Sequence, residues 1–582
     1  MDTESISTSS CPSLSGDEIE KQSTSEDVTK RSESPCLSTP TVLHWFRMNS
    51  LRMHDNPALH KAMTDPARRF RCVFVIDPWF AVGEKRFCVN RWKFLLECLH
   101  DIDKRLHSLN SRLYVAKGHP IAVLEKMCAD WNVESITYQV DCDPRSTAEE
   151  QALDKLAQTL NIESHKFYSH TLYEPAKVIA CNGNRPLTTF KDFKALLPLL
   201  GAPESPLNPT LADFGKLFVS DGDLSEDFSI PTLADLGFPN DLLYTSEWIG
   251  GETEALRKLP IYCQLRARAP TNPVDTLFDK SAMSPYIKYG CLSVRYFLWT
   301  VKWLAKNNPT LEVLAKDVYS KLLLREFYFT VALQIPNFDT SVNNPICIPY
   351  PWDNDYSAFR LWKEGKTGYP WIDAAMRQLN KEGWIHHHLR ESAASFLTRG
   401  DLWVSWVWGK DVFEELLLDY EPSVSCGCWM RSSCCAFVTV PVEHYCPVTF
   451  GQKLDPEGIY IKTYVPELKG MPAEYIFSPW LAPLEVQQAT QPGPSAVRSS
   501  RLSSSLYKAC LQNPVGQRCT DDLCVFCFHC SVTFPFYCTF TLYVFRLQSG
   551  FLNFILINIP PEIPVLCCSL RLAKLVFRRG RL

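Results

Sequence analysis

Three consecutive histidines, His386 to His388, are the first group of residues that could bind a metal ion. Imidazole is a common zinc ligand, but neighbouring residues on a helix point about 100 degrees apart. Helical ligand pairs are spaced four residues apart instead, as in H-E-x-x-H. His387 and Glu391 have that spacing, yet the segment supplies no third ligand. The sequence therefore predicts no metal site.

Two charged residues in apolar surroundings form a second group. Arg390 lies on an apolar helical background, and an arginine that enters a core needs a carboxylate partner. Asp419 ends the apolar run "EELLLD" (414–419) and needs a partner for the same reason. The pair is either a structural ion pair or a pair that faces a polar cofactor, and the local sequence does not separate these alternatives.

Tryptophans and serines form a third group. Trp403 and Trp406 are three residues apart on one predicted helix, so they share a face, and Trp352 and Trp429 complete the set. Such spacing is typical of core packing, but an indole can also lose one electron, and stacked indoles can relay the resulting hole. "DKSAMSPYIKYGCLS" (279–293) offers hydroxyl and N–H groups where a loop turns into a helix, which suits phosphate binding.

In the N-terminal part of the chain, strand-like segments alternate with helix-like segments. Strand-like runs occur at 41–47, 69–77, 112–118 and 135–141, and helix-period segments occur at 90–109 and 146–161. This alternation predicts an α/β domain with a parallel sheet and crossover helices. No G-x-G-x-x-G follows the first strand, so a dinucleotide site is not expected there.

The C-terminal half has a different pattern. Amphipathic segments such as 317–333, 370–383 and 387–399 alternate with Gly and Pro, which predicts an all-helical domain. The chain of 582 residues is also too long for one compact core. The predicted parts are listed in chain order: a disordered Ser/Thr-rich arm (1–40), an α/β domain (41–170), a connector (171–245), a helical domain (246–485) and an atypical tail (486–582).

Composition limits the class of protein. The net charge of −4 gives no basic signature over the whole chain, so nucleic-acid binding would need a local patch. The polar, acidic start "MDTESISTSS" has no apolar run, so no secretory signal is expected, and the 24 cysteines are expected to be thiols.

The tail does not match the rest of the chain, because all 16 tryptophans precede residue 481. Its uncharged run 524–545 is long enough for a membrane span. A tail unique to this protein and translated non-coding sequence are the alternatives, and a membrane span is the least favoured of the three.

Together these segments resemble the photolyase and cryptochrome family over about residues 41–485. "HWFRMNSLRMHDNPAL" (44–59) is similar to the opening of its α/β domain. The motifs that are similar to its flavin domain are "MSPYIKYGCLS" (283–293), "REFYF" (325–329), "NNPICIPYPWD" (343–353), "GYPWIDAAMRQL" (368–379), "GWIHH" (383–387), "FLTRGDLW" (396–403) and "CPVTFGQKLDPEGIYIKTYVPEL" (446–468).

The resemblance implies a non-covalent FAD, folded into a U in the helical domain, that absorbs blue light. The residues implied to bind it are Tyr262, Ser281, Ser284, Lys321, His387, Arg390, Asp419, Tyr420, Glu421 and Ser425. Ser281 and Ser284 match the phosphate-binding turn, and Ser425 matches the neighbour of flavin N5. Trp429, Trp406 and Trp352 match the proximal, middle and distal members of the electron-transfer chain, with Trp403 as a fourth.

Departures from the family decide between repair and signalling. Enzymes that repair cyclobutane dimers have Glu and Trp where this chain has Lys321 and Leu324. Enzymes that repair (6-4) lesions have a second histidine where this chain has Glu391, which cannot act as an imidazolium. The resemblance therefore implies a photoreceptor without DNA-repair activity. "SHTLYEP" (169–175) and "IKTYVPEL" (461–468) most resemble the light-sensing, insect-type cryptochromes of animals.

The function expected from this resemblance is blue-light signalling to clock or other signalling proteins in nucleus and cytoplasm. A charge change on the flavin would move His387 and a C-terminal segment that partners recognise. DNA binding is expected to be weak or vestigial, and membrane association is not expected. A light-independent circadian repressor scaffold and a DNA photolyase are the alternatives. An antenna pigment in the α/β domain is left open.

Overall fold

A computed structural model describes residues 40–63, 69–80, 87–207, 228–239, 246–268, 273–306, 308–437 and 445–490, and the backbone of two further strands in 541–557. The arm predicted over 1–40 lies outside these residues apart from Pro40. Most of the tail predicted over 486–582 lies outside them too.

The N-terminal part is built on a parallel sheet, as the sequence predicts. Within the described residues five strands lie in the order β3-β2-β1-β4-β5. Every pair is parallel, and Thr41 of β1 lies opposite Arg69 of β2 and Val133 of β4. The strands are β1 (Thr41–Phe46), β2 (Arg69–Ile76), β3 (Leu113–Lys117), β4 (Val133–Gln139) and β5 (Glu163–Phe167).

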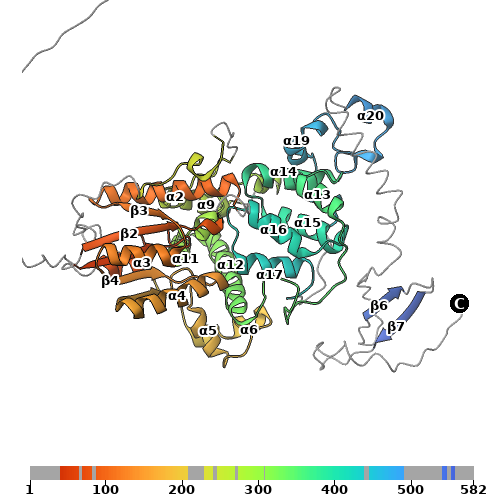
Figure 1. Cartoon of the computed structure of the whole chain (residues 1–582). Coiled ribbons are helices and arrows are strands. Elements are labelled where there is room, and N and C mark those ends of the chain that lie inside the picture. The colour runs from red at the N-terminus through yellow and green to blue at the C-terminus, as the bar shows by residue number, and fades with distance from the viewer. Residues whose placement is uncertain are drawn as a thin grey trace, which may run out of the picture. The chain divides into compact units, whose positions relative to one another are not determined.

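Helices cover both faces of this sheet (Figure 1). Leu43 and Val73 pack with apolar residues of α3 and α4 on one face, whereas Val42 and Phe74 pack with those of α2 on the other. β1 is therefore buried along its whole length, which is why it appears as one apolar run in the sequence. The helices are α1 (Pro57–Met63), α2 (Val89–His107), α3 (Pro120–Asp130) and α4 (Pro144–Leu160), with a short η1 (Pro78–Phe80).

Two features of this half were not predicted from the sequence. The edge strand β5 has the sequence ESHKF, and its side chains are exposed or half-buried, so it carries no apolar pattern. The predicted connector 171–245 contains three short helices and a 3-10 turn, and residues 208–227 and 240–245 of it lie outside the described residues. These elements are α5 (Pro175–Cys181), α6 (Phe190–Ala195), α7 (Leu197–Leu200) and η3 (Ala234–Leu236).

The rest of the folded chain is helical, which confirms the predicted fold class. The long helix α12 extends further than the predicted 317–333. The elements are α9 (Glu252–Ala267), η4 (Pro273–Leu277), α10 (Ser284–Lys288), α11 (Val294–Ala305), α12 (Pro309–Gln334), α13 (Tyr356–Glu364), α14 (Pro370–Glu382), α15 (His387–Ser395), a π-helical turn η5 (Phe396–Gly400), α16 (Trp406–Leu416), α17 (Pro422–Ser432), α18 (Thr449–Leu454), α19 (Ile459–Tyr464), η6 (Pro466–Leu468), η7 (Pro479–Leu481) and α20 (Leu484–Ala489).

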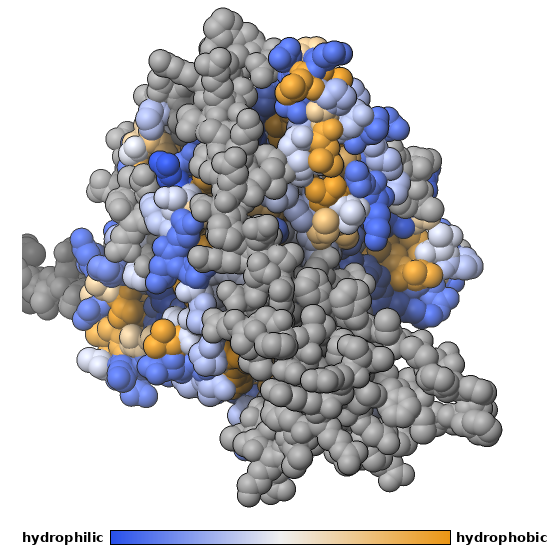
Figure 2. Space-filling model, turned by 90° about the vertical axis from the view of Figure 1, so that its right-hand side faces the viewer, coloured by the Kyte–Doolittle hydropathy of each residue, from blue (hydrophilic) through white to orange (hydrophobic). Residues whose placement is uncertain are grey.

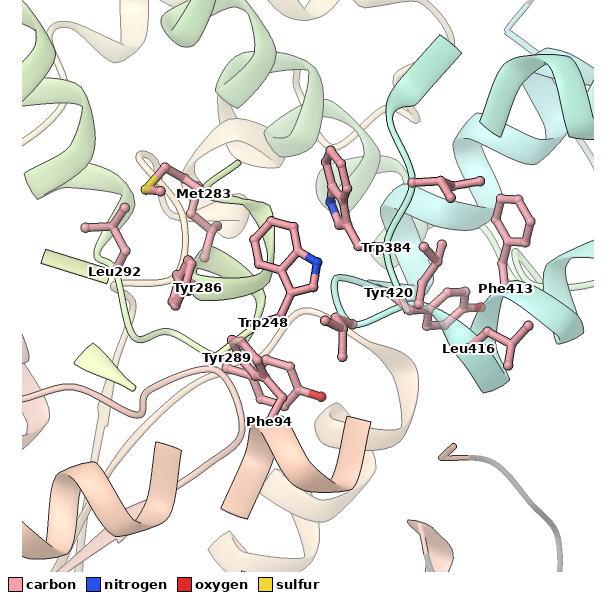
Figure 3. Packing of buried hydrophobic residues seen from close by; sticks show 14 of the residues in the cluster. Phe94, Trp248, Met283, Tyr286, Tyr289, Leu292, Trp384, Phe413, Leu416 and Tyr420 are labelled. Atoms are coloured by element: carbon pink, nitrogen blue, oxygen red, sulfur yellow. The ribbon is translucent and has the colours of Figure 1, made fainter. Parts of the chain in front are cut away.

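One continuous apolar core joins the sheet to the helices. Trp248 and Trp384 belong to it, with ring centres 5.2 Å apart, and residues of α2, α10 and α16 lie around them (Figure 3). Buried charges add to this junction. The Glu252 carboxylate accepts hydrogen bonds from the backbone N–H groups of Met53 and His54, and Asp55 pairs with Arg295 at 2.7 Å.

Gly290 marks a close approach between backbone segments of the two parts. It has a φ of +64°, and a Cβ atom there would lie 2.0 Å from the backbone oxygen of Asn49. We expect Gly290→Ala to lower the free energy of unfolding by about 1 kcal/mol for the left-handed conformation and by about 1–3 kcal/mol more for the clash. Gly183→Ala is the matched control, because Gly183 has a φ of +66° and no atom within 4 Å of the new Cβ. Equal unfolding midpoints of the two variants in denaturant would contradict this prediction.

The described strands of the tail form an antiparallel pair, β6 (Thr541–Arg546) and β7 (Leu552–Ile557). The end of the apolar run 524–545 thus lies in a strand, and the rest of that run is outside the described residues. In the described part of the chain, no helix combines the length and the apolar character that crossing a membrane requires. On the face in Figure 2, hydrophobic residues form separate groups with hydrophilic residues between them.

Candidate functional site

The ion pair expected between Arg390 and Asp419 is present in the structure. Nη2 of Arg390, on α15, lies 2.9 Å from Oδ2 of Asp419, in the loop between α16 and α17. The Arg390 Nε–H also donates to the carbonyl of Ile385 at 2.9 Å. The Asp419 side chain is 3% exposed and that of Arg390 is 26% exposed, so the arginine is the member nearer to solvent.

Local sequence places Asp419 on this loop. Pro422 is the first residue of α17, where its missing N–H and preset φ suit a helix start. Leu418 donates its backbone N–H to the carbonyl of Gly383 at 2.8 Å, which ties the loop to the turn before α15. The two charges therefore meet although 29 positions separate them.

A second set of residues is the one predicted to bind the phosphates. Ser281 is buried, and its backbone N–H donates to Asp279 at 2.7 Å. Ser284 accepts a hydrogen bond from the indole of Trp384 at 3.2 Å. Tyr262, on α9, is half-buried, and burial raises the pKa of its phenol to about 12, so it is a hydrogen-bond donor at neutral pH.

Oδ1 of Asp419 and Oγ of Ser281 are two of the buried side-chain atoms that have no hydrogen-bond partner in the described part of the chain. An unsatisfied buried polar atom costs free energy, so a ligand that pairs with it would stabilise the site. A carboxylate oxygen accepts a hydrogen bond from a ring N–H, and a hydroxyl donates to a phosphate oxygen. Both atoms fit FAD, which carries these groups.

The three histidines gather more closely than the spacing argument predicts. Their ring centres lie 4.0 to 5.0 Å apart, and one nitrogen of each lies within 4.8 Å of the others. That argument is wrong at His386, which is in an extended conformation before the start of α15. Nδ1 of His386 accepts the backbone N–H of His388 as a helix cap at 3.4 Å. Burial and then the charges of His388, Arg266 and Arg390 lower the pKa of His386 to about 3.

The histidine expected beside the flavin, His387, is exposed, whereas His386 is buried. Lys321 is also exposed and pairs with Asp317 at 2.7 Å. Its charge is among those that lower the pKa of His386, after burial and the charges of His388, Arg266 and Arg390. Glu391 accepts a hydrogen bond from the hydroxyl of Tyr445 at 2.9 Å.

The tryptophans lie on different elements. Trp429, on α17, is 3% exposed and packs on Gly409, whose Cβ would lie 2.3 Å from its ring. Gly409 is one turn beyond the fully buried Trp406 on α16. In the described part of the chain no ring-to-ring contact involves Trp406.

Trp352 and Trp403 do contact each other, with ring centres 5.6 Å apart. Trp403 has a φ of +51° and precedes α16, so the prediction that it shares one helix with Trp406 is wrong. Trp403 follows the turn at Asp401 and Leu402 and contacts Trp352. A positive φ is uncommon for a residue other than glycine.

The structure does not bring Glu421 to the Arg390–Asp419 pair. Its carboxylate accepts two hydrogen bonds from Arg325 of α12, at 2.7 and 2.8 Å, and lies 3.1 Å from Nε2 of His170. Sequence reasoning missed this cluster. Arg325 lies in the apolar run "LLLREFYF" and, like Arg390, therefore needs a carboxylate partner. Ser425 lies one turn before Trp429 on α17, and its backbone N–H donates to the backbone carbonyl of Glu421.

Tyr420 lines a cavity of about 590 Å³ where the ends of β1 and β2 face α16 and α17. Aromatic and charged side chains line it, among them Trp45, Phe74, Arg47 and Lys410. Ser281, Arg390 and Asp419 do not line it, so this cavity is separate from the Arg390–Asp419 pair, and the cofactor role of Tyr420 stays a prediction.

Comparison with known proteins identifies similar chains. A family model described as "FAD binding domain of DNA photolyase" matches residues 318–502, and one described as "DNA photolyase" matches residues 42–206. Cryptochrome-2 of Gallus gallus is 43% identical over 460 residues, which covers 77% of this chain and 78% of that protein. Cryptochrome-1 of Mus musculus is 43% identical over 459 residues, which covers 77% of this chain and 75% of that protein.

Solved structures are similar as well. The cryptochrome of Synechocystis sp. PCC6803 has a TM-score of 0.66 at 26% identity and covers 80% of this chain and 99% of its own. A photolyase of Sulfolobus tokodaii, solved with two FAD molecules, has a TM-score of 0.63 at 25% identity and covers 81% of this chain and 100% of its own.

Proposed function

This chain belongs to the FAD-binding photolyase and cryptochrome family, and from that premise we propose that it is a blue-light photoreceptor rather than a repair enzyme. One observation carries the proposal. The loop and helix that hold Asp419, with its unpaired buried oxygen, also hold the buried Trp429 ten residues later. A cofactor contact and an electron donor thus occupy one continuous segment.

The residues of this chain have distinct tasks. When bound, FAD would supply a chromophore for blue light that can be reduced by one electron. Oδ2 of Asp419 holds Arg390, and its Oδ1 would accept a ring N–H. The guanidinium of Arg390 would stabilise negative charge that develops beside it. Trp429 would donate the electron, and its burial would keep water from the resulting indole radical. The hydroxyl of Ser281 would donate to a phosphate oxygen.

Three side chains support the absence of repair. Lys321 pairs with Asp317 and is a cation, so it cannot replace a carboxylic acid. Leu324 offers no aromatic face to a flipped base, and Glu391 is a hydrogen-bond acceptor for Tyr445. Repair of irradiated DNA by the purified protein would overturn this part of the proposal.

Trp429→Phe is expected to remove most of the light-dependent bleaching of the flavin band, because phenylalanine is much harder to oxidise than tryptophan. Absorption spectra of the purified protein before and after blue light measure the effect. Trp303→Phe is the control, since Trp303 is 64% exposed on α11. Unchanged bleaching in Trp429→Phe would contradict the proposal, and purified protein without flavin would favour the light-independent repressor scaffold.

Clock or signalling proteins in nucleus and cytoplasm remain the proposed partners. Similarity to cryptochromes of Gallus gallus and Mus musculus supports this class of partner. The narrower likeness to insect-type cryptochromes stays a prediction, as do the domain boundaries. The C-terminal segment that would carry the signal lies outside the described residues.

A second candidate concerns the 590 Å³ cavity. Its volume and aromatic lining are typical of a site for a flat organic ligand, and the Sulfolobus tokodaii relative was solved with two FAD molecules. We propose an antenna pigment as its occupant. Release of a second chromophore besides FAD from heat-denatured protein would support this. Titration of the protein with pigment in which binding does not saturate would contradict it.

A further inference from the structure

A series of aromatic rings leads from Trp429 to the surface along α13. The ring of Trp362 lies 6.3 Å from Trp429, and the ring of Phe359 is stacked 6.1 Å from Trp362. Trp408 of α16 lies 5.2 Å from Phe359, and Tyr356 lies 6.4 Å from Trp408, all measured between ring centres. These contacts are continuous, whereas Trp406 has no ring contact among the described residues.

The geometry of α13 explains the series. Tyr356, Phe359 and Trp362 are spaced three residues apart, so they lie along one face of the helix. Trp362 is fully buried and Tyr356 is 67% exposed, so this face passes from the core to the solvent. Trp408 reaches the same face from α16.

The chemistry of the members suits hole transfer. The indole N–H of Trp362 donates to the backbone carbonyl of Ala393 at 3.1 Å. A carbonyl is a weak base, so an oxidised Trp362 keeps its proton and can pass the hole on. Tyr356 is in contact with water, so its phenol can release a proton when it loses an electron. Phe359 is too hard to oxidise and acts only as the ring between Trp362 and Trp408.

We propose that Trp362, Trp408 and Tyr356 form a second electron relay from Trp429 to the solvent, parallel to the one through Trp406. The inference rests on the proposed photoreceptor function. With FAD bound, Trp429 would give up one electron to the light-excited cofactor, and the hole would move to Trp362, then to Trp408 and then to Tyr356. Tyr356 loses one electron and one proton, the proton goes to water, and a neutral tyrosyl radical remains.

The first test uses the whole FAD-loaded protein under blue light. Trp406→Phe is expected to keep part of the light-dependent bleaching, and Trp406→Phe with Trp362→Phe is expected to lose it. A nitroso spin trap is expected to form an adduct that mass spectrometry maps to Tyr356, and Tyr356→Phe is expected to lose the adduct. Tyr356→Phe changes an exposed side chain, so the protein should fold normally. Trp303→Phe is the matched control.

A second test does not need the flavin. Flash-quenched tris(bipyridine)ruthenium oxidises aromatic side chains of flavin-free protein. The exposed Tyr356 gives a prompt radical signal by direct oxidation, and the delayed part of that signal should fall in Trp408→Phe because Trp408 feeds it. Complete loss of bleaching in Trp406→Phe alone, with no adduct at Tyr356, would overturn the relay. Absence of bleaching in the unchanged protein would instead overturn the photoreceptor function, and the ruthenium test would still decide the relay.

Discussion

Replacing Glu421 with glutamine is expected to lower the free energy of unfolding by about 3–5 kcal/mol, the cost of leaving a buried charge without its partner. Arg325 is buried, and two of its nitrogens donate to the Glu421 carboxylate. Glutamine has nearly the same shape but no charge, so the guanidinium would remain charged in a site from which water is excluded. Urea unfolding of the purified protein, followed by circular dichroism, measures the change.

Lys321→Gln is the matched control, because Lys321 lies on α12 with Arg325. Lys321 and Asp317 form an exposed pair four residues apart, and such pairs contribute about 0.3–0.5 kcal/mol. Comparable losses of stability in Glu421→Gln and Lys321→Gln would contradict the assignment of the Arg325–Glu421 pair as a structural junction.

The same pair predicts a pH dependence. Burial opposes ionisation of Glu421, but Arg325 and His170 outweigh it and hold the pKa of this carboxyl well below its ordinary value. A carboxyl whose pKa is lowered by folding contributes stability above its unfolded pKa of about 4.3, and this contribution is lost as the pH falls further. The stability difference between the unchanged protein and Glu421→Gln should therefore shrink below about pH 4.3.

Replacing Asp419 with asparagine is expected to weaken FAD binding by about 2–5 kcal/mol, which is about 30-fold to several thousand-fold in Kd. The carboxylate neutralises Arg390 through Oδ2 and leaves Oδ1 as an acceptor in a buried position. Asparagine removes the charge from both contacts at once. Titration of flavin-free protein with FAD, followed by flavin fluorescence, measures the loss.

Glu312→Gln serves as the control for this titration, because Glu312 forms an exposed pair with Lys316 on α12. An unchanged Kd in Asp419→Asn would show that the Arg390–Asp419 pair is purely structural, the alternative that the local sequence leaves open. Loss of folding is checked by the unfolding midpoint of Asp419→Asn without FAD.

The sequence by itself determined the fold class, because local periodicity reflects which faces of an element are buried. β1 is buried throughout and mostly apolar since helices cover both faces of the sheet, and α2 shows its helical period since Leu95, Leu99, Ile102 and Leu106 pack on the core. β5 escaped prediction for the same reason, because its side chains are not buried and its pattern carries no signal.

Only the tertiary structure decided which residues meet. The sequence indicated that Arg390 and Asp419 each need a partner, but Glu421 could not be assigned from its neighbours, because its partners Arg325 and His170 lie 96 and 251 positions away. The start of α15 at His387 likewise gathers the three histidines, and Trp403 contacts Trp352 after a turn. Composition and hydrophobic period are local properties of a chain, whereas contacts across such separations depend on how all the elements pack together.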